Sequence, residues 1–289
     1  ESVVSAFVSL DGKAVSFTDH TLVIPSPESI GECATLAVDL MILNHGYSHV
    51  GYFDSEHISS LVGNDILSEK EPTGALTPPN AVYTNADTKT TLFAFRSGVP
   101  SGRMQEFSEE IESWFKEGGF KRIVLLASTY NPVRKIRVSN IQIPRLFYYE
   151  NPHFASSASL KSVTEDLKLE RFGHWIENKL TPFDELKDMP GSGQGLSLFK
   201  KLINKEFEVV VYTLLSMGGV DVLGGWAFHN LLSKLAGHSQ DDEEMIDTSS
   251  KPDIAPDFET QQEGMAILEK LYNGTSGLKI PFYWRSIAT

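Results

Sequence analysis

A glycine-rich turn is the first place in this sequence where residue types and spacing could support chemistry. Residues 191–195 read Gly-Ser-Gly-Gln-Gly and precede an apolar stretch that begins at Leu196. Glycines before a helix can present backbone N–H groups to a phosphate. This turn follows Pro190 rather than a strand, and it lacks the lysine and hydroxyl of a P-loop. We interpret it as a flexible turn where two backbones approach closely, and keep nucleotide binding as the alternative.

The turn after the first short apolar run, residues 22–24, carries acidic side chains that would repel a phosphate. It reads PSPESIGE, with one glycine, no lysine, and glutamates at positions 28 and 32. A dinucleotide site would place G-x-G-x-x-G at this point. Carboxylates near a helix N-terminus suit the helix dipole, but they would repel an anion bound there. Binding of a phosphate group, the commonest ligand of an α/β domain, is therefore disfavoured at this turn.

The other candidates for catalysis or metal binding are single residues without visible partners. His45 and His49 have i,i+4 spacing, but Gly46 lies between them at a predicted helix end, and no H-E-x-x-H occurs. His57 lies beside two acidic residues in a predicted loop. Ser128 follows a predicted strand, but no G-x-S-x-G elbow is present, and we interpret it as a turn serine. We therefore expect no catalytic residue, no metal and no cofactor.

Two residues of the first predicted helix have unusual types for their positions. Cys33, the only cysteine, lies on the apolar side and is interpreted as a buried small hydrophobe, and a lone cysteine excludes an internal disulfide. Asp39 lies between Leu36 and Leu40. A buried carboxylate is costly without a partner, so Asp39 either makes a structural contact inside the protein or faces outward.

The elements that must position these residues alternate between strands and helices. Residues 22–24, 30–42 and 50–53 read as strand, helix and strand, which predicts a βαβ unit in an α/β domain. Further strands are predicted near residues 3–8 at an edge and at 81–84, 91–96, 122–127 and 145–149. Further helices are predicted from Ser101 to Gly118, over 167–180, from an N-cap at Asp221 to Ala236, and over 261–272.

One stretch, residues 196–217, carries conflicting signals for its secondary structure. Val209, Val210 and Val211 favour a strand because β-branched side chains pack well on a sheet. The long apolar run that ends at Gly218 equally fits a buried helix.

Composition limits the class of protein. The chain has 289 residues, 41% of them apolar and 22% charged, which is ordinary for a globular protein. The net charge of −13 argues against nucleic-acid binding, and the local basic group Arg134, Lys135 and Arg137 is interpreted as a solvated edge. No apolar run approaches the roughly 20 residues of a membrane helix. No secretory signal opens the sequence, so we expect an intracellular protein without membrane contact.

The last ten residues, 280–289, combine aromatic side chains with an arginine. Such a composition is typical of interface anchors, although a closing strand packed on the core would look the same. The residues concerned are Ile280, Phe282, Tyr283, Trp284, Arg285 and Ile287. Both interpretations stay open for Phe282 and Trp284.

Several segments taken together resemble the proteasome assembly chaperone 2 family. They are LVIPSPESIGECATLAVDLMI, HVGYF, LVGND, FAFRSGV, RIVLLAS, MPGSGQG and IPFYWR, in this order between residues 22 and 285. Each segment is a weak signal alone, but their order and spacing make the set specific. The chain departs from the family at Glu32, which stands where the family has the asparagine of an IGN-type turn.

The resemblance implies a Rossmann-like three-layer α/β sandwich, with a central mixed sheet flanked by helices and a helix over residues 203–217. We expect a single domain over residues 1–289 with a C-terminal tail at 280–289, and the acidic, proline-containing composition of residues 240–260 predicts a mobile loop there. The alternative is a small-molecule or nucleotide-dependent enzyme on a Rossmann-like scaffold, acting through residues 191–195 or the end of the RIVLLA strand.

The family's activity is implied by the same resemblance. A member would be a non-enzymatic chaperone, cytoplasmic and also nuclear, that pairs with proteasome assembly chaperone 1 as a heterodimer. The pair would bind the proteasome α ring, promote its assembly and block premature activator binding. Family tails can end in a hydrophobic–Tyr–any motif, and here Ala288 replaces the tyrosine. The expected partner-binding residues of the tail are Trp284, Arg285, Ile287, Ala288 and Thr289.

Overall fold

A computed structural model gives the structure of the chain. It describes residues 6–69, 74–130, 146–155, 163–167, 169–171, 173–176, 179–182, 191–216, 221–238, 278–281 and 283. The predicted acidic loop at 240–260 and the predicted helix at 261–272 lie outside these residues.

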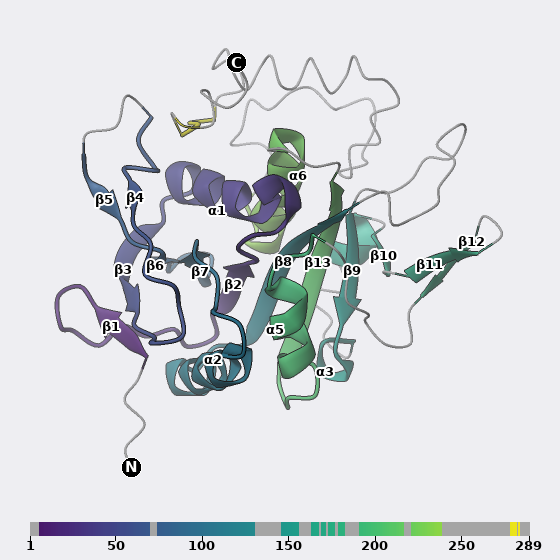
Figure 1. The fold of residues 1–289 in the computed structure, drawn as a ribbon, viewed down its shortest axis with the longest axis horizontal. Helices are drawn as coiled ribbons and strands as arrows, with labels where there is room; N and C mark the ends of the chain where they lie inside the picture. Colours follow the sequence, from purple (N-terminus) through teal and green to yellow (C-terminus); the bar gives the residue numbers. More distant parts are fainter. Residues whose placement is uncertain are drawn as a thin grey trace.

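Nine strands of the described residues form one mixed sheet, in the order β1-β3-β6-β7-β2-β8-β13-β9-β10 (Figure 1). The strands are β1 (Phe7–Ser9), β2 (Thr21–Pro25), β3 (Ser48–Phe53), β6 (Asn80–Asn85), β7 (Thr90–Phe95), β8 (Arg122–Tyr130), β9 (Leu146–Glu150), β10 (Glu170–Arg171) and β13 (Glu208–Ser216). The central pairs β7–β2, β2–β8 and β8–β13 are parallel. The pairs β1–β3, β3–β6 and β6–β7 on one side, and β13–β9 on the other, are antiparallel.

Helices cover both faces of this sheet, as Figure 1 shows. Helices α1 (Cys33–Asn44) and α6 (Val222–Leu235) share one apolar cluster with one face, and α2 (Met104–Gly118) and α5 (Gly195–Leu202) share a second cluster with the other. The remaining short elements are η1 (Ile30–Glu32), α3 (Pro152–Ala155), the ladder β4 (Gly63–Asn64) with β5 (Leu76–Thr77), and the ladder β11 (Gly173–Ile176) with β12 (Lys179–Pro182). The three-layer α/β sandwich with a mixed central sheet is thus confirmed.

The local sequence explains the principal elements. Strand β8 is buried at every position before Tyr130, because helices cover it on both faces, and it therefore reads as a continuous apolar run. Helix α2 buries Phe107, Ile111 and Trp114 at helical spacing and ends where Gly119 takes a φ of +69°. None of the described helices is long and apolar enough to cross a membrane.

Most predicted boundaries agree with the structure to within a few residues. The predicted βαβ unit is β2, α1 and β3, although β6 and β7 lie between its two strands in the sheet. The predicted edge strand is β1, and helix α2 begins at Met104 rather than at Ser101. Asp221 caps helix α6 as predicted, because its Oδ1 accepts a 2.8 Å hydrogen bond from the Gly224 N–H.

The helix expected over residues 203–217 is wrong. This stretch forms β13, which pairs along its whole length with β8 and also with β9. The three β-branched residues Val209, Val210 and Val211 are all fully buried there, because strands flank β13 and helices cover its faces. The intrinsic preference of these residues therefore indicated the correct structure, and the resemblance did not.

The helix predicted over residues 167–180 is also wrong. The described residues of this stretch include β10, β11 and the first half of β12. Strand β10 adds in parallel to β9 at the edge of the sheet, and β11 and β12 form a local hairpin in which Ile176 faces Lys179. Strand pairing thus overrode the helical spacing of the apolar positions, and periodicity does not report such pairing.

Candidate functional site

The carboxyl ends of the parallel strands are where an α/β sheet would bind a ligand. There, the loop after β2, residues 25–32, lies against the glycine turn of residues 191–195. Ser29 and Ser192 form an antiparallel bridge, and the Ile30 N–H donates a 2.6 Å hydrogen bond to the Gly191 carbonyl. We call this contact the closed crevice, because the two segments bind each other at the place where a ligand would otherwise bind.

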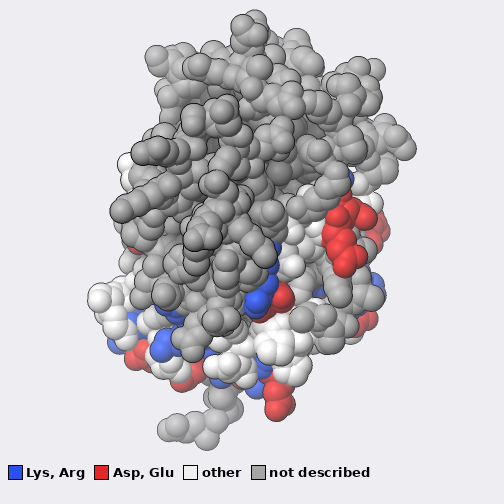
Figure 2. Space-filling model, turned by 90° about the vertical axis from the view of Figure 1, so that its right-hand side faces the viewer, with Lys and Arg blue, Asp and Glu red and all other residues white. Residues whose placement is uncertain are grey.

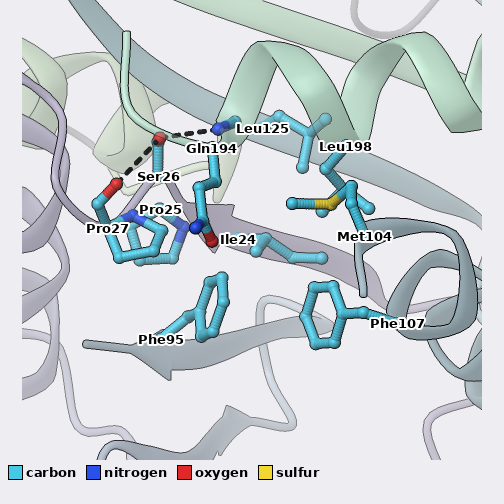
Figure 3. A pocket seen from close by; sticks show the side chains of 11 residues that line it. Ile24, Pro25, Ser26, Pro27, Phe95, Met104, Phe107, Leu125, Gln194 and Leu198 are labelled. Atoms are coloured by element: carbon cyan, nitrogen blue, oxygen red, sulfur yellow. Dashed lines mark hydrogen bonds between the residues drawn. The ribbon is translucent and has the colours of Figure 1, made fainter. Parts of the chain in front are cut away.

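Ser26 links the two sides of the closed crevice (Figure 3). Its hydroxyl is buried, donates to the Ser192 carbonyl at 2.8 Å, and accepts from the Gly195 N–H at 2.7 Å. The Gly195 amide opens helix α5 and is the group that would bind an anion at this turn. Because the Ser26 hydroxyl already occupies it, a phosphate would have to break this contact to bind.

The glycines of the turn are required by close packing. A Cβ atom on Gly193, whose φ is +59°, would lie 2.2 Å from the Pro27 carbonyl oxygen. A Cβ atom on Gly195 would lie 2.7 Å from the Ser26 Cβ. The prediction of a turn where two backbones approach closely is therefore confirmed.

A small apolar hollow lies beneath the closed crevice, as Figure 3 shows. It leaves no room for a water molecule, whereas ligand pockets usually measure about 300–1,000 Å³. Gln194 lies at this hollow and exchanges hydrogen bonds of 2.5 and 2.7 Å with the backbone of Val99. The other residues that line the hollow include Ile24, Phe95, Met104, Phe107, Leu125 and Leu198. This geometry does not suit a nucleotide.

Ser128 is not a turn serine, since it lies within β8 and is fully buried. Its hydroxyl donates to the Ile30 carbonyl and lies 3.1 Å from the Ser29 hydroxyl. Neither partner is a base that could activate a nucleophile. Ser128 thus fastens the loop after β2 to the central strand.

Asp39 faces the interior, where it forms an ion pair with Arg96 of the segment after β7. The Tyr283 hydroxyl donates to its second carboxylate oxygen. Burial alone would lower the pKa of Arg96, but the adjacent Asp39 carboxylate outweighs this and raises the pKa above its ordinary value. The structural contact proposed for Asp39 is therefore the correct alternative, and its partners come from two distant segments.

The segment of Tyr283 is further attached to helix α1. The Asn44 side chain accepts a 2.7 Å hydrogen bond from the Lys279 N–H and donates a 3.0 Å bond to the Lys279 carbonyl. Ile280 is 1% exposed. For its described residues, the segment thus packs on the core as a closing strand would, while Phe282 and Trp284 lie outside the described residues.

His45 and His49, which have i,i+4 spacing in the sequence, contact different residues. The His49 ring stacks on that of Tyr83. His45 approaches His229 of helix α6, with 2.8 Å between their Nε2 atoms, and its ring centre lies 4.3 Å from that of His238. Burial, together with neighbouring histidines, lowers the pKa of His229 to about 3 and that of His45 to about 4. His57 contacts Arg103 at 2.7 Å. Among the described residues, no group of histidine, cysteine and acidic side chains could hold a metal ion.

Charge on the described surface is mixed. On the described part of the face in Figure 2, Lys and Arg side chains lie among Asp and Glu side chains. Nucleic-acid binding requires a continuous basic surface, which this part does not offer. The candidate group Arg134, Lys135 and Arg137 lies outside the described residues, as do the predicted tail residues Trp284, Arg285, Ile287, Ala288 and Thr289.

Sequence reasoning missed the Arg96 and Tyr283 partners of Asp39. A lone carboxylate in an otherwise apolar helix signals that a partner is needed, but it does not say which. The partners lie 57 and 244 residues further along the chain. Only the fold brings them to the same point.

Comparison with known proteins agrees with this fold. The model of the PAC2 family matches residues 24–267. The chain is 25% identical to "Proteasome assembly chaperone 2" of Danio rerio over 234 residues, which are 78% of this chain and 86% of that protein. It is 25% identical to the human protein of the same name over 212 residues, which are 71% of this chain and 76% of the relative.

Solved structures show the same architecture at lower sequence identity. Pyrococcus furiosus PbaA, described as an archaeal homologue of proteasome-assembly chaperone, aligns with a TM-score of 0.53 at 14% identity over 89% of this chain and 91% of its own. Pyrococcus furiosus PbaB, described as an archaeal proteasome activator, aligns with a TM-score of 0.52 at 16% identity over 93% and 99%. The family match spans most of the sequence, from the end of β2 past helix α6. The chain therefore belongs to the PAC2 family.

Proposed function

We propose that this chain is a subunit of a proteasome assembly chaperone. It pairs with a related chaperone, proteasome assembly chaperone 1, and the heterodimer binds the proteasome α ring. There it promotes assembly of the core particle and blocks premature binding of activators. The observation that carries this proposal is the family match over residues 24–267, together with relatives named as proteasome assembly chaperone 2.

The proposal includes a non-enzymatic mode of action. The closed crevice supports it, because the Gly195 N–H donates to Ser26 and the Gly191 carbonyl accepts from Ile30 where a substrate or nucleotide would bind. Ser128, the best-placed nucleophile, is committed to the Ile30 carbonyl. A protein that works by binding other proteins needs no activated group at this position.

Two finer parts of the proposal concern the tail and the compartment. The tail residues Trp284, Arg285, Ile287, Ala288 and Thr289 contact the α ring, with Ile287 in the hydrophobic position of the family motif. The chain acts in the cytoplasm and also in the nucleus. Microscopy of the tagged protein in its own cells tests the compartment.

The function is tested by purifying the tagged protein from its own cells and identifying the associated proteins by mass spectrometry. We expect a stoichiometric related chaperone and α subunits, with few mature β subunits. A variant with Trp284→Ala and Ile287→Ala should lose the associated α subunits and keep the chaperone partner. Lys13→Ala, at an exposed residue far from the tail in the sequence, is the control and should lose neither. A protein that purifies alone with a bound small molecule would contradict the proposal.

A further inference from the structure

The β4–β5 ladder and its flanking residues, 61–66 and 74–77, form a projection that we call the arm. In Figure 1, β4 and β5 lie above β3, on the side of the molecule opposite β11 and β12. Leu61, Val62 and Leu76 of the arm are 64%, 59% and 75% exposed. They are the most exposed large apolar side chains of the described residues.

The fold does not use these three side chains. The arm is attached through other apolar residues, because Ile58 enters the core just before it and Leu67 packs on the cluster around α1 just after it. The Asp65 N–H also donates a 2.7 Å hydrogen bond to the Ala75 carbonyl and fixes the turn. The arm therefore has an attached side and an unused apolar side.

The ladder brings two of the three unused side chains together. Asn64 pairs with Leu76, so these two residues share one face of the ladder. The two-residue period, continued before β4, places Val62 on this face, diagonal to Leu76, and Leu61 on the opposite face. Exposed apolar groups gathered on one element mark a protein-binding surface more often than scattered ones do.

Acidic residues lie within and on either side of residues 61–66 in the sequence, and we call them the acidic border. They are Asp54, Glu56, Asp65 and Glu69, in a stretch, 54–69, that has no lysine or arginine. Lys70 and Glu71, which follow, cancel in formal charge. Lys279 lies 3.4 Å from Glu69 and offsets its charge. The stretch of sequence that includes β4 is thus net acidic.

We propose that the arm inserts into an apolar groove, bordered by lysine or arginine, on the related chaperone that pairs with this chain. The inference rests on the proposed heterodimer. Apolar side chains this exposed need lasting cover, which a permanent partner gives and a passing contact does not. A second copy of this chain is a poor occupant, since its own acidic border would face this one and each copy carries a net charge of −13.

The test compares a triple variant, Leu61→Ser with Val62→Ser and Leu76→Ser, with a control variant, Val8→Ser with Leu10→Ser. The control removes exposed apolar side chains of similar size at β1, outside the arm. Each is titrated with the purified related chaperone by calorimetry. We expect the triple variant to bind about 100-fold more weakly and the control to bind within about twofold of the wild type. Circular dichroism checks that both fold.

The outcomes separate the arm from the proposed function. Equal binding by the triple variant and the wild type overturns the arm assignment and leaves the heterodimer intact. A wild-type chain that does not bind the related chaperone overturns the heterodimer, and the arm assignment falls with it. A wild-type homodimer that the triple variant abolishes would identify a second copy as the occupant instead. Asp65→Lys with Glu69→Lys should slow association and weaken its dependence on salt, and an unchanged rate contradicts the basic border.

Discussion

The closed crevice and the arm use their side chains in opposite ways. In the closed crevice, the polar groups of Ser26, Ser128 and Gly195 bond to groups of the same chain. In the arm, Leu61 and Leu76 contact little of their own chain. The place where a Rossmann-like sheet binds small molecules is thus occupied from within, whereas apolar side chains of the arm stay exposed. This contrast is what the proposed chaperone function requires.

The largest effect should come from opening the closed crevice at Gly193. Gly193→Ala should lower the free energy of unfolding by about 3 kcal/mol, since the added Cβ combines a left-handed backbone with a clash against Pro27. Gly12 is a matched control, because its φ of +70° is similar and no atom lies within 4 Å of its added Cβ. Gly12→Ala should therefore cost only about 1 kcal/mol. Equal losses in urea denaturation would show that the crevice is loosely packed.

Acid should weaken the interior before it affects the arm, because His229 is buried as a neutral group. Its folded pKa of about 3 lies below the ordinary value of 6.5, so the unfolded chain binds a proton first. The contribution of neutral His229 to the free energy of unfolding is present above pH 6.5 and is lost as the pH falls. From pH 7 to pH 5 the loss for this residue is about 2 kcal/mol. Urea denaturation at both values measures it, and His229→Gln should flatten the dependence.

The Tyr283 contact gives the next effect. Tyr283→Phe removes a hydrogen bond to a buried carboxylate and should lower the free energy of unfolding by about 2 kcal/mol. Tyr130, which is 39% exposed, provides the control, and Tyr130→Phe should change it by less than about 0.5 kcal/mol. If the two variants unfold alike in urea, the segment around Tyr283 does not stabilise α1.

The smallest effect should come from the arm, and it is the sharpest comparison. Leu76→Ala should change the free energy of unfolding by less than about 0.5 kcal/mol, because the side chain is 75% exposed. Leu198→Ala, in the hollow beneath the crevice, removes a side chain that is 2% exposed and should cost about 3 kcal/mol. A large loss from Leu76→Ala would mean that the arm packs on its own chain and is not free for a partner.

The sequence predicts the elements whose signals are local. Helix α6 was found from Asp221 and Gly237, and strand β8 from its continuous apolar run, since caps and burial leave marks at the residues concerned. Strand β10 was missed because it pairs with β9, a separate segment 23 residues earlier, where Glu170 faces Phe147. For β13, the valines indicate a strand correctly, whereas the resemblance implies a helix.

The site was predictable only in part, for the same reason. The glycines at 191–195 indicated a close approach of two backbones, but not that the other backbone is the loop at 25–32. The arm was not recognised, because leucine and valine in a sequence indicate burial and carry no mark of exposure. Long-range contacts and exposure are properties of the folded chain.

The two sides of the closed crevice are far apart in the sequence and are therefore synthesised at different times. Ser26 and Ser192 are separated by 166 residues. A ribosome adds about 5–20 residues per second, so the loop after β2 leaves it about 10–30 s before its glycine turn does. During synthesis, the end of β2 therefore stays open and its polar groups stay hydrated. Nascent chains stalled before residue 190 should expose this loop to proteases that the finished protein resists.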